Sequence, residues 1–113
     1  MRIADELRLR DALMASPTLG VTNVCPVVAD EATTFPYIAY KRVNSEFDAW
    51  KRANGVYKIT MEVVVWSDDY DESIVVAERA MDVISAEHGM SIQNCIEGYE
   101  GGAYYQLITI TIE

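Results

Sequence analysis

The sequence has little of what catalytic and metal-binding sites usually require. Its 113 residues include one histidine, His88, and two cysteines, Cys25 and Cys95, which lie far apart in the chain. A single histidine makes a zinc site of the usual cysteine and histidine type very unfavourable. Neither cysteine belongs to a CxxC pair. Two reduced thiols that act as small apolar side chains are therefore favoured over a disulfide.

Other catalytic motifs are missing as well. Gly98, Gly101 and Gly102 lead into a strand-like segment and not into a helix, so they do not form a phosphate-binding loop. No serine has the setting of a nucleophile elbow. The acidic run at residues 68–72 lacks the spacing and central glycine of an EF-hand loop, and helix capping explains it more simply. We therefore expect no enzyme activity, no cofactor and no metal.

Long apolar runs are also absent. None approaches the roughly 18 residues of a membrane span, so no membrane partner is expected. The first six residues mix acidic and basic side chains and lack the apolar core of a signal peptide, which predicts a cytoplasmic product. The length fits one domain, residues 1–113, with half of the chain apolar or aromatic.

What the chain has in excess is acid, and this excess is uneven. Eighteen acidic against nine basic side chains give a net charge of -9, which is unfavourable for gripping nucleic acid. Residues 1–58 carry a net +1 and residues 59–113 a net -10, and five basic residues fall within 41–58. Copies of such a chain can dock head to tail through opposite charge. The simpler alternative, that these are solvated faces, stays open.

Apolar spacing predicts two helices, at residues 3–14 and 70–85. Asp69 and Glu72 have the spacing of a capping box at the start of the second helix. The buried stripes are expected to be Ile3, Leu7 and Met14 with Leu13 beside them in the first helix, and Ile74, Ala77, Met81 and Ile84 in the second.

Alternating apolar residues predict four or five strands. They are expected at residues 35–43, 56–66, 90–99 and 103–113, with a short fifth strand at 25–28. Pro26 favours an edge position for that short strand. Residues 44–55 are expected to form a polar loop. The element order predicts an α+β domain, in which an antiparallel sheet of four to five strands has two helices packed on one face.

Two regions are candidates for protein contacts. The sheet face away from the helices is expected to be polar but is interrupted by Val64, Trp66, Tyr105 and Leu107. With these residues the face is too apolar to be only a solvated surface. In the loop, Phe47 and Trp50 either fold back as a satellite cluster or anchor a neighbouring subunit. The candidate interface residues are Arg42, Phe47, Trp50, Lys51, Arg52, Lys58, Trp66 and Tyr105.

Several segments occur in an informative order. An N-terminal helix precedes the strand entry Phe35-Pro36-Tyr37-Ile38, and a long strand ending Val63-Val64-Val65-Trp66-Ser67 is followed at once by the helix from Tyr70 to Ser85. The chain closes with Tyr105-Gln106-Leu107-Ile108-Thr109-Ile110. In this order, over most of its length, the chain resembles the small tail-completion, or tail-terminator, proteins that join head to tail in long-tailed phages and prophages.

The resemblance implies a subunit without catalytic residues, which assembles into a ring, usually a hexamer. Such a ring caps the tail tube in the virion tail, meets the head connector proteins and is made in the host cytoplasm. DNA would pass through without specific binding, and an acidic lumen would repel its phosphates. Residues 41–58 and the acidic remainder are candidate complementary patches. The alternative function is a small cytoplasmic regulatory or ligand-binding domain, dimeric through its sheet, which requires a concave apolar pocket.

Overall fold

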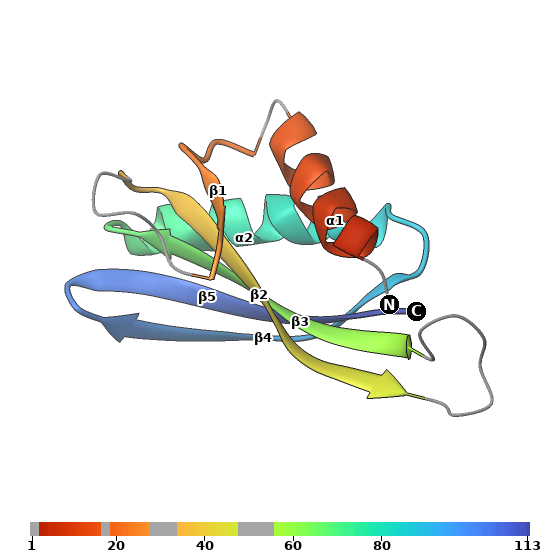
Figure 1. Ribbon diagram of the computed structural model, residues 1–113. Coiled ribbons are helices and arrows are strands. Elements are labelled where there is room, and N and C mark those ends of the chain that lie inside the picture. The colour runs from red at the N-terminus through yellow and green to blue at the C-terminus, as the bar shows by residue number, and fades with distance from the viewer. Residues whose placement is uncertain (1–2, 17–18, 28–33, 48–55) are drawn as a thin grey trace.

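The computed structural model describes residues 3–16, 19–27, 34–47 and 56–113 (Figure 1). These ranges contain two helices, α1 (Ile3–Ala15) and α2 (Tyr70–Ser85). They also contain five strands: β1 (Val24–Pro26), β2 (Tyr37–Phe47), β3 (Val56–Ser67), β4 (Met90–Glu100) and β5 (Ala103–Ile112). The strands form one sheet in the order β1-β2-β3-β5-β4.

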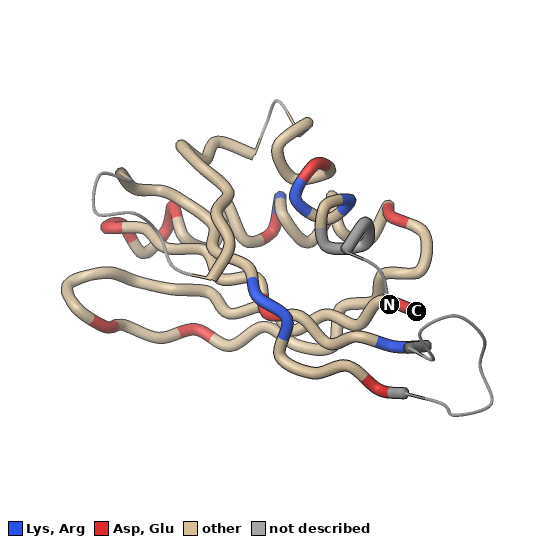
Figure 2. The backbone as a smooth tube through the Cα atoms, in the orientation of Figure 1, with Lys and Arg blue, Asp and Glu red and all other residues tan. Residues whose placement is uncertain are grey.

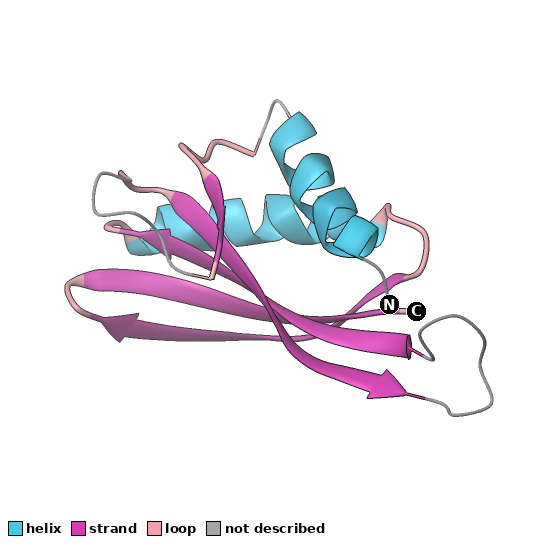
Figure 3. Ribbon diagram, viewed as in Figure 1, coloured by secondary structure: helices cyan, strands magenta, loops and turns pink. Residues whose placement is uncertain are grey.

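Both helices lie on one face of the sheet, which confirms the expected α+β class (Figure 3). The sheet is mixed, however, because β1 pairs with β2 in parallel, whereas the other three pairs are antiparallel as expected. Neither helix in the described ranges is long and apolar enough to cross a membrane.

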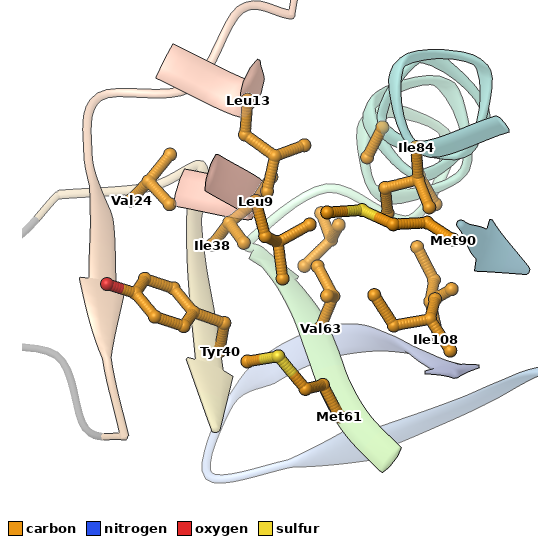
Figure 4. Close-up of a cluster of buried hydrophobic side chains, with 14 of the residues drawn as sticks. Leu9, Leu13, Val24, Ile38, Tyr40, Met61, Val63, Ile84, Met90 and Ile108 are labelled. Atoms are coloured by element: carbon orange, nitrogen blue, oxygen red, sulfur yellow. The ribbon is translucent and has the colours of Figure 1, made fainter. Parts of the chain in front are cut away.

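The core fills the space between the helices and the sheet (Figure 4). On β3 the alternate residues Ile59, Met61, Val63 and Val65 are at most 2% exposed, and on β5 Ile108, Ile110 and Ile112 are at most 3% exposed. This confirms the alternation predicted for both strands. It also confirms which face of each strand is turned to the helices.

The expected buried stripe of α1 is partly wrong: Leu13 is buried as expected, Leu7 and Met14 are not, and the side chain of Ile3 lies outside the description. Leu9 and Leu13 are fully buried, whereas Leu7 is 40% and Met14 59% exposed. Residues 9 and 13 are about one turn apart, and residue 7 lies about 200° around the helix from residue 9. A tertiary bond helps to set this rotation, because Arg8 Nη2 donates to the carbonyl of His88 at 2.8 Å.

The stripe of α2 is partly wrong. Ala77 and Ile84 are buried as expected, but Val76 and Ala80 complete the stripe, and Ile74 and Met81 are only half-buried. Ser73 explains the rotation, because its Oγ accepts from Gln106 Nε2 of β5 at 3.3 Å. The buried residues lie three, four, seven and eleven positions after Ser73, and these positions share its side of the helix.

The start of α2 confirms the predicted cap with one difference. Asp69 is the N-cap residue, and its carboxylate accepts from the Glu72 amide at 3.0 Å. In a capping box the Glu72 carboxylate would return to the Asp69 amide. Here it accepts from Ser67 Oγ at 2.6 Å, and Ser67 Oγ accepts from the Asp69 amide at 3.1 Å. Ser67 Oγ thus links the Asp69 amide to the Glu72 carboxylate, which in a capping box would be bonded directly.

The expected loop at 44–55 is partly strand. β2 continues to Phe47 and pairs with β3 up to Val56, with a register shift between Arg42 and Asn44. The Lys58–Glu46 ion pair, at 3.6 Å, joins the two strands in this extension. Residues 48–55 lie outside the described ranges. The expected turn between β4 and β5 is confirmed, since Gly101 and Gly102 have φ of 61° and 82°, values that favour glycine.

Candidate protein-contact surface

The sheet face turned away from the helices, called the outer face below, is organised in rows that cross the strands. Residues directly opposite each other in an antiparallel pair share a face, so the register defines each row. Three successive rows run from β2 across β3 and β5 to β4. The aromatic row is Tyr37, Trp66, Tyr105 and Gly98; the aliphatic row is Ala39, Val64, Leu107 and Ile96; the polar row is Lys41, Glu62, Thr109 and Asn94.

The aromatic row depends on a glycine. A Cβ on Gly98 would lie 2.7 Å from Cε2 of Tyr105, and closer still to its Cζ and Oη, so the Tyr105 ring rests against the β4 backbone. The same ring packs on Trp66 with centroids 5.1 Å apart and a tilt of 50°. Phe35 stacks on Tyr37 at 5.6 Å and extends the aromatic surface beyond the row. These rings are half-buried or exposed.

The aliphatic row lies beside a hollow of about 280 Å³. Its lining combines the aliphatic row with the rings and charges on either side: Val27, Ala39, Tyr40, Lys41, Glu62, Val64, Trp66, Glu100, Tyr105 and Leu107. Ile96, at the end of this row, is 57% exposed. The hollow is thus apolar over Ala39, Val64 and Leu107, and it has charged groups at its rim.

From the polar row onward, the outer face carries charged side chains whose positive and negative charges nearly cancel. Lys41 pairs with Glu62 at 3.6 Å, with side chains 51% and 25% exposed. Exposed pairs of this kind contribute about 0.2–1 kcal/mol. Counted along the described strands, the charges of this face are Lys41, Lys58, Glu46, Glu62 and Glu100. They are nearly neutral together, in a chain with a net charge of -9; Figure 2 shows the basic residues of the sheet on β2 and β3.

The structure brings together two of the sequence-predicted interface residues, Trp66 and Tyr105. Lys58 lies further along β3 in its ion pair with Glu46, and Arg42 is exposed on β2 opposite Met61. Phe47 ends β2, and nothing further is described of its side chain. The other three predicted residues, Trp50, Lys51 and Arg52, lie outside the described ranges.

Sequence reasoning missed Tyr37, Ile96 and Gly98 as members of this surface. A signal for them exists in the sequence. The two-residue turn Gly101-Gly102 joins β4 to β5 and sets the register of this hairpin. This register places Gly98 opposite Tyr105. The absence of a side chain at Gly98 then marks a site where a neighbouring ring lies close to the backbone.

Ser73 and Gln106, two buried polar residues of the described ranges, are joined in one hydrogen-bond chain. Ser73 Oγ donates to the Tyr70 carbonyl at 2.6 Å and accepts from Gln106, whose Oε1 accepts from Cys95 Sγ at 3.7 Å. Desolvation, with a contribution from Glu97, raises the pKa of Cys95, which disfavours a nucleophilic thiolate. Among the described residues, no group of three or more histidine, cysteine or acidic side chains could hold a metal ion.

An aromatic cluster lies at the same end of the sheet but on the helix side. Tyr104 of β5 contacts Tyr99 at 4.8 Å and Tyr70 at 5.5 Å between centroids. A hydrogen bond to Glu97 is the main cause that raises the pKa of Tyr70. Aromatic side chains therefore gather on both faces of the sheet near the β4–β5 turn.

Comparison with known proteins adds no assignment to this surface. No protein-family model matches the chain, and no curated protein matches its sequence. The resemblance to tail-completion proteins therefore rests on the sequence segments alone.

Proposed function

We propose that this protein is a structural subunit of a phage or prophage tail, which forms a ring that caps the tail tube and joins it to the head connector. It acts by assembly and not by catalysis. The observation that supports this most is the outer face, where most residues of the aromatic and aliphatic rows remain partly exposed on a sheet whose other face is already covered by helices. Exposed apolar patches of this kind mark protein contacts.

The charge supports the same proposal. A net charge of -9 per chain would make the surface of a ring repel the phosphates of passing DNA. The near-neutral outer face is the part of such a chain at which copies can approach each other with little repulsion. A ring of this kind carries no specific DNA site and needs no cofactor.

Absolute mass by light scattering, over a range of protein and salt concentrations, tests the ring. A species near six chains supports it, and weakening by salt indicates charge complementarity at the interface. The variant with Lys51→Glu and Arg52→Glu should then weaken assembly. A monomer is next mixed with purified tail tubes and imaged at the tube ends. A protein that neither forms rings nor binds tube ends contradicts the proposal.

The alternative is a small regulatory or ligand-binding domain, dimeric through its sheet. The observation that favours it is the hollow of about 280 Å³, which has apolar walls and the Lys41–Glu62 pair at its rim. Its volume is near the lower limit of small-molecule sites, about 300 Å³. A salt-insensitive dimer in the same light-scattering series would favour this alternative over the ring.

A further inference from the structure

We propose that the hollow of the outer face receives α1 of a second copy of this chain, with Met14 as the side chain that enters it. This inference rests on the proposed ring and names the contact that would build it. Met14 is 59% exposed and Leu7 is 40% exposed, so α1 presents two large apolar side chains to solvent. They are two turns apart and lie on one side of the helix.

The chemistry of the two surfaces matches. Methionine is unbranched and fills irregular apolar gaps, and its sulfur packs favourably against aromatic rings. The hollow offers the aliphatic residues Ala39, Val64 and Leu107 together with the rings of Trp66 and Tyr105. The occupant therefore needs a flexible apolar side chain on a protruding element, which Met14 on α1 supplies.

The spacing of the two surfaces is also compatible. Residues seven apart in a helix are separated by about 10 Å along its axis, and alternate residues of a strand by about 7 Å. With Met14 in the hollow beside the aliphatic row, Leu7 can lie over the neighbouring aromatic row. Both apolar rows would then be covered by the same helix.

Charges beside the apolar residues complete the match. Arg10 and Asp11 form an exposed ion pair at 3.1 Å between the two apolar residues of α1. The rim of the hollow carries Lys41, Glu62 and Glu100. Each surface thus has charges of both signs that can exchange partners, and the rim carries one acid, Glu100, beyond the Lys41–Glu62 pair.

The geometry of the fold makes this contact head to tail. α1 lies on one side of the sheet (Figure 1). The residues that line the hollow belong mainly to the outer face, so no copy can fill its own hollow. Each copy would offer one α1 and one hollow to two different neighbours. Contacts of this heterologous type close into rings when the rotation between neighbours allows it.

The test uses two variants that each block one side. Leu107→Glu places a charge in the hollow, and Met14→Glu places one on α1. Matched controls are Thr109→Glu, on the same face of the same strand, and Ala15→Glu, beside Met14 in α1. All four positions are exposed or half-buried, and urea unfolding of each variant verifies that the fold is retained.

We expect each blocking variant to weaken association at least tenfold, with both controls close to wild type. An equimolar mixture of the two blocking variants should form a dimer, because the intact α1 of one fits the intact hollow of the other. If Leu107→Glu alone disrupts assembly and Met14→Glu does not, the contact is two-fold between sheets and the inference is wrong. It is also wrong if both variants assemble like wild type, or if wild type stays monomeric at its highest soluble concentration.

These results separate the contact from the proposed function. Rings that persist in both blocking variants would retain the tail proposal and reject this contact. Dimers restored by mixing, in a protein that does not bind tail tubes, would retain the contact and reject the tail proposal.

Discussion

The two faces of the same strands differ in how their apolar residues are distributed. On the inner face, four successive inward positions of β3, from Ile59 to Val65, and three of β5, from Ile108 to Ile112, are apolar and buried. On the outer face the apolar residues stop after two rows, and Lys41, Glu62 and Thr109 follow. The inner apolar pattern thus continues over more positions of each strand than the outer one, which is confined to two rows at one end.

This difference separates residues required for folding from residues available for binding. A continuous apolar face is what a sheet buries when its own helices pack on it. The apolar patch of the outer face is bounded by charges, and no element among the described residues covers it. Its apolar residues are therefore not needed to bury a helix of the same chain. We infer that substitutions on the inner face act on the free energy of unfolding, and that those on the outer face act on association.

The largest expected effect tests this separation directly. Ile108→Ala should lower the free energy of unfolding by about 3 kcal/mol, because it removes buried methylene groups and leaves a cavity. Leu107→Ala, the next residue on the opposite face, should cost only about 1 kcal/mol, because its side chain is half-buried. Urea unfolding of both variants gives the comparison. Equal costs would contradict it.

The second largest effect is expected for Gln106, a buried polar residue on the inner face. Gln106→Ala should lower the free energy of unfolding by about 2 kcal/mol, because it removes the hydrogen bond to the buried Ser73 that holds α2 on β5. Gln93→Ala is the control, since Gln93 bonds Thr111 from an exposed position. A similar cost for the two variants, measured by urea unfolding, would show that the buried bond is not special.

Gly98→Ala should have a smaller effect on stability and a clear optical one. The added methyl group must displace the Tyr105 ring, which costs about 1 kcal/mol of packing with Trp66. In a Trp50→Phe background, the emission of Trp66 should shift as it loses its neighbour. Asn94→Ala on the same strand should leave the emission unchanged. An unshifted emission for Gly98→Ala would mean that the ring stays in place.

Removing the surface ion pair should have almost no effect on folding. Lys41→Gln is expected to change the free energy of unfolding by less than about 0.5 kcal/mol, because both partners are partly solvated. The difference should disappear at 1 M salt, where exposed charges are screened. A loss above this value that persists at high salt would show a packing role for the Lys41 side chain.

The smallest effect concerns the two thiols. Burial raises the pKa of Cys25, and desolvation with a contribution from Glu97 raises that of Cys95. The folded protein therefore holds these protons more tightly, so their contribution to stability is lost as pH rises through the raised pKa values. Alkylation followed by mass spectrometry should be slow at pH 8, with exposed Cys95 ahead of Cys25.

Glu97→Gln sharpens the thiol prediction. Without the nearby negative charge, the pKa of Cys95 should fall and its alkylation should accelerate. Cys25 serves as the internal control, because burial alone raises its pKa. Equal rate changes at both cysteines would indicate loosening of the fold and not a local charge effect.

Much of the fold was predictable from local patterns. The α+β class, the alternation of β3 and β5, and the start of α2 at the Asp69 cap all follow from residues close together in the sequence. The buried sides of α1 and α2 were not predictable in this way. Each helix has apolar residues on more than one side, and bonds from distant residues, His88 to α1 and Gln106 to α2, accompany the observed rotations.

The candidate surface was predictable only in part. Trp66, Tyr105, Val64 and Leu107 could be assigned to the outer face because alternation along one strand is a local property. Their arrangement into rows with Tyr37 and Ile96 could not be derived from any single strand. It depends on the register between strands, and the expected loop at 44–55 concealed the last residues of β2.

By itself the sequence determined the element types, the apolar faces of the central strands and the excess of acid. It did so because periodicity and charge are properties of neighbouring residues. Only the tertiary structure decided which helix sides are buried, that β1 is parallel to β2, and that aromatic, aliphatic and polar residues form separate rows. These features depend on contacts between residues distant in the chain, which no local pattern specifies.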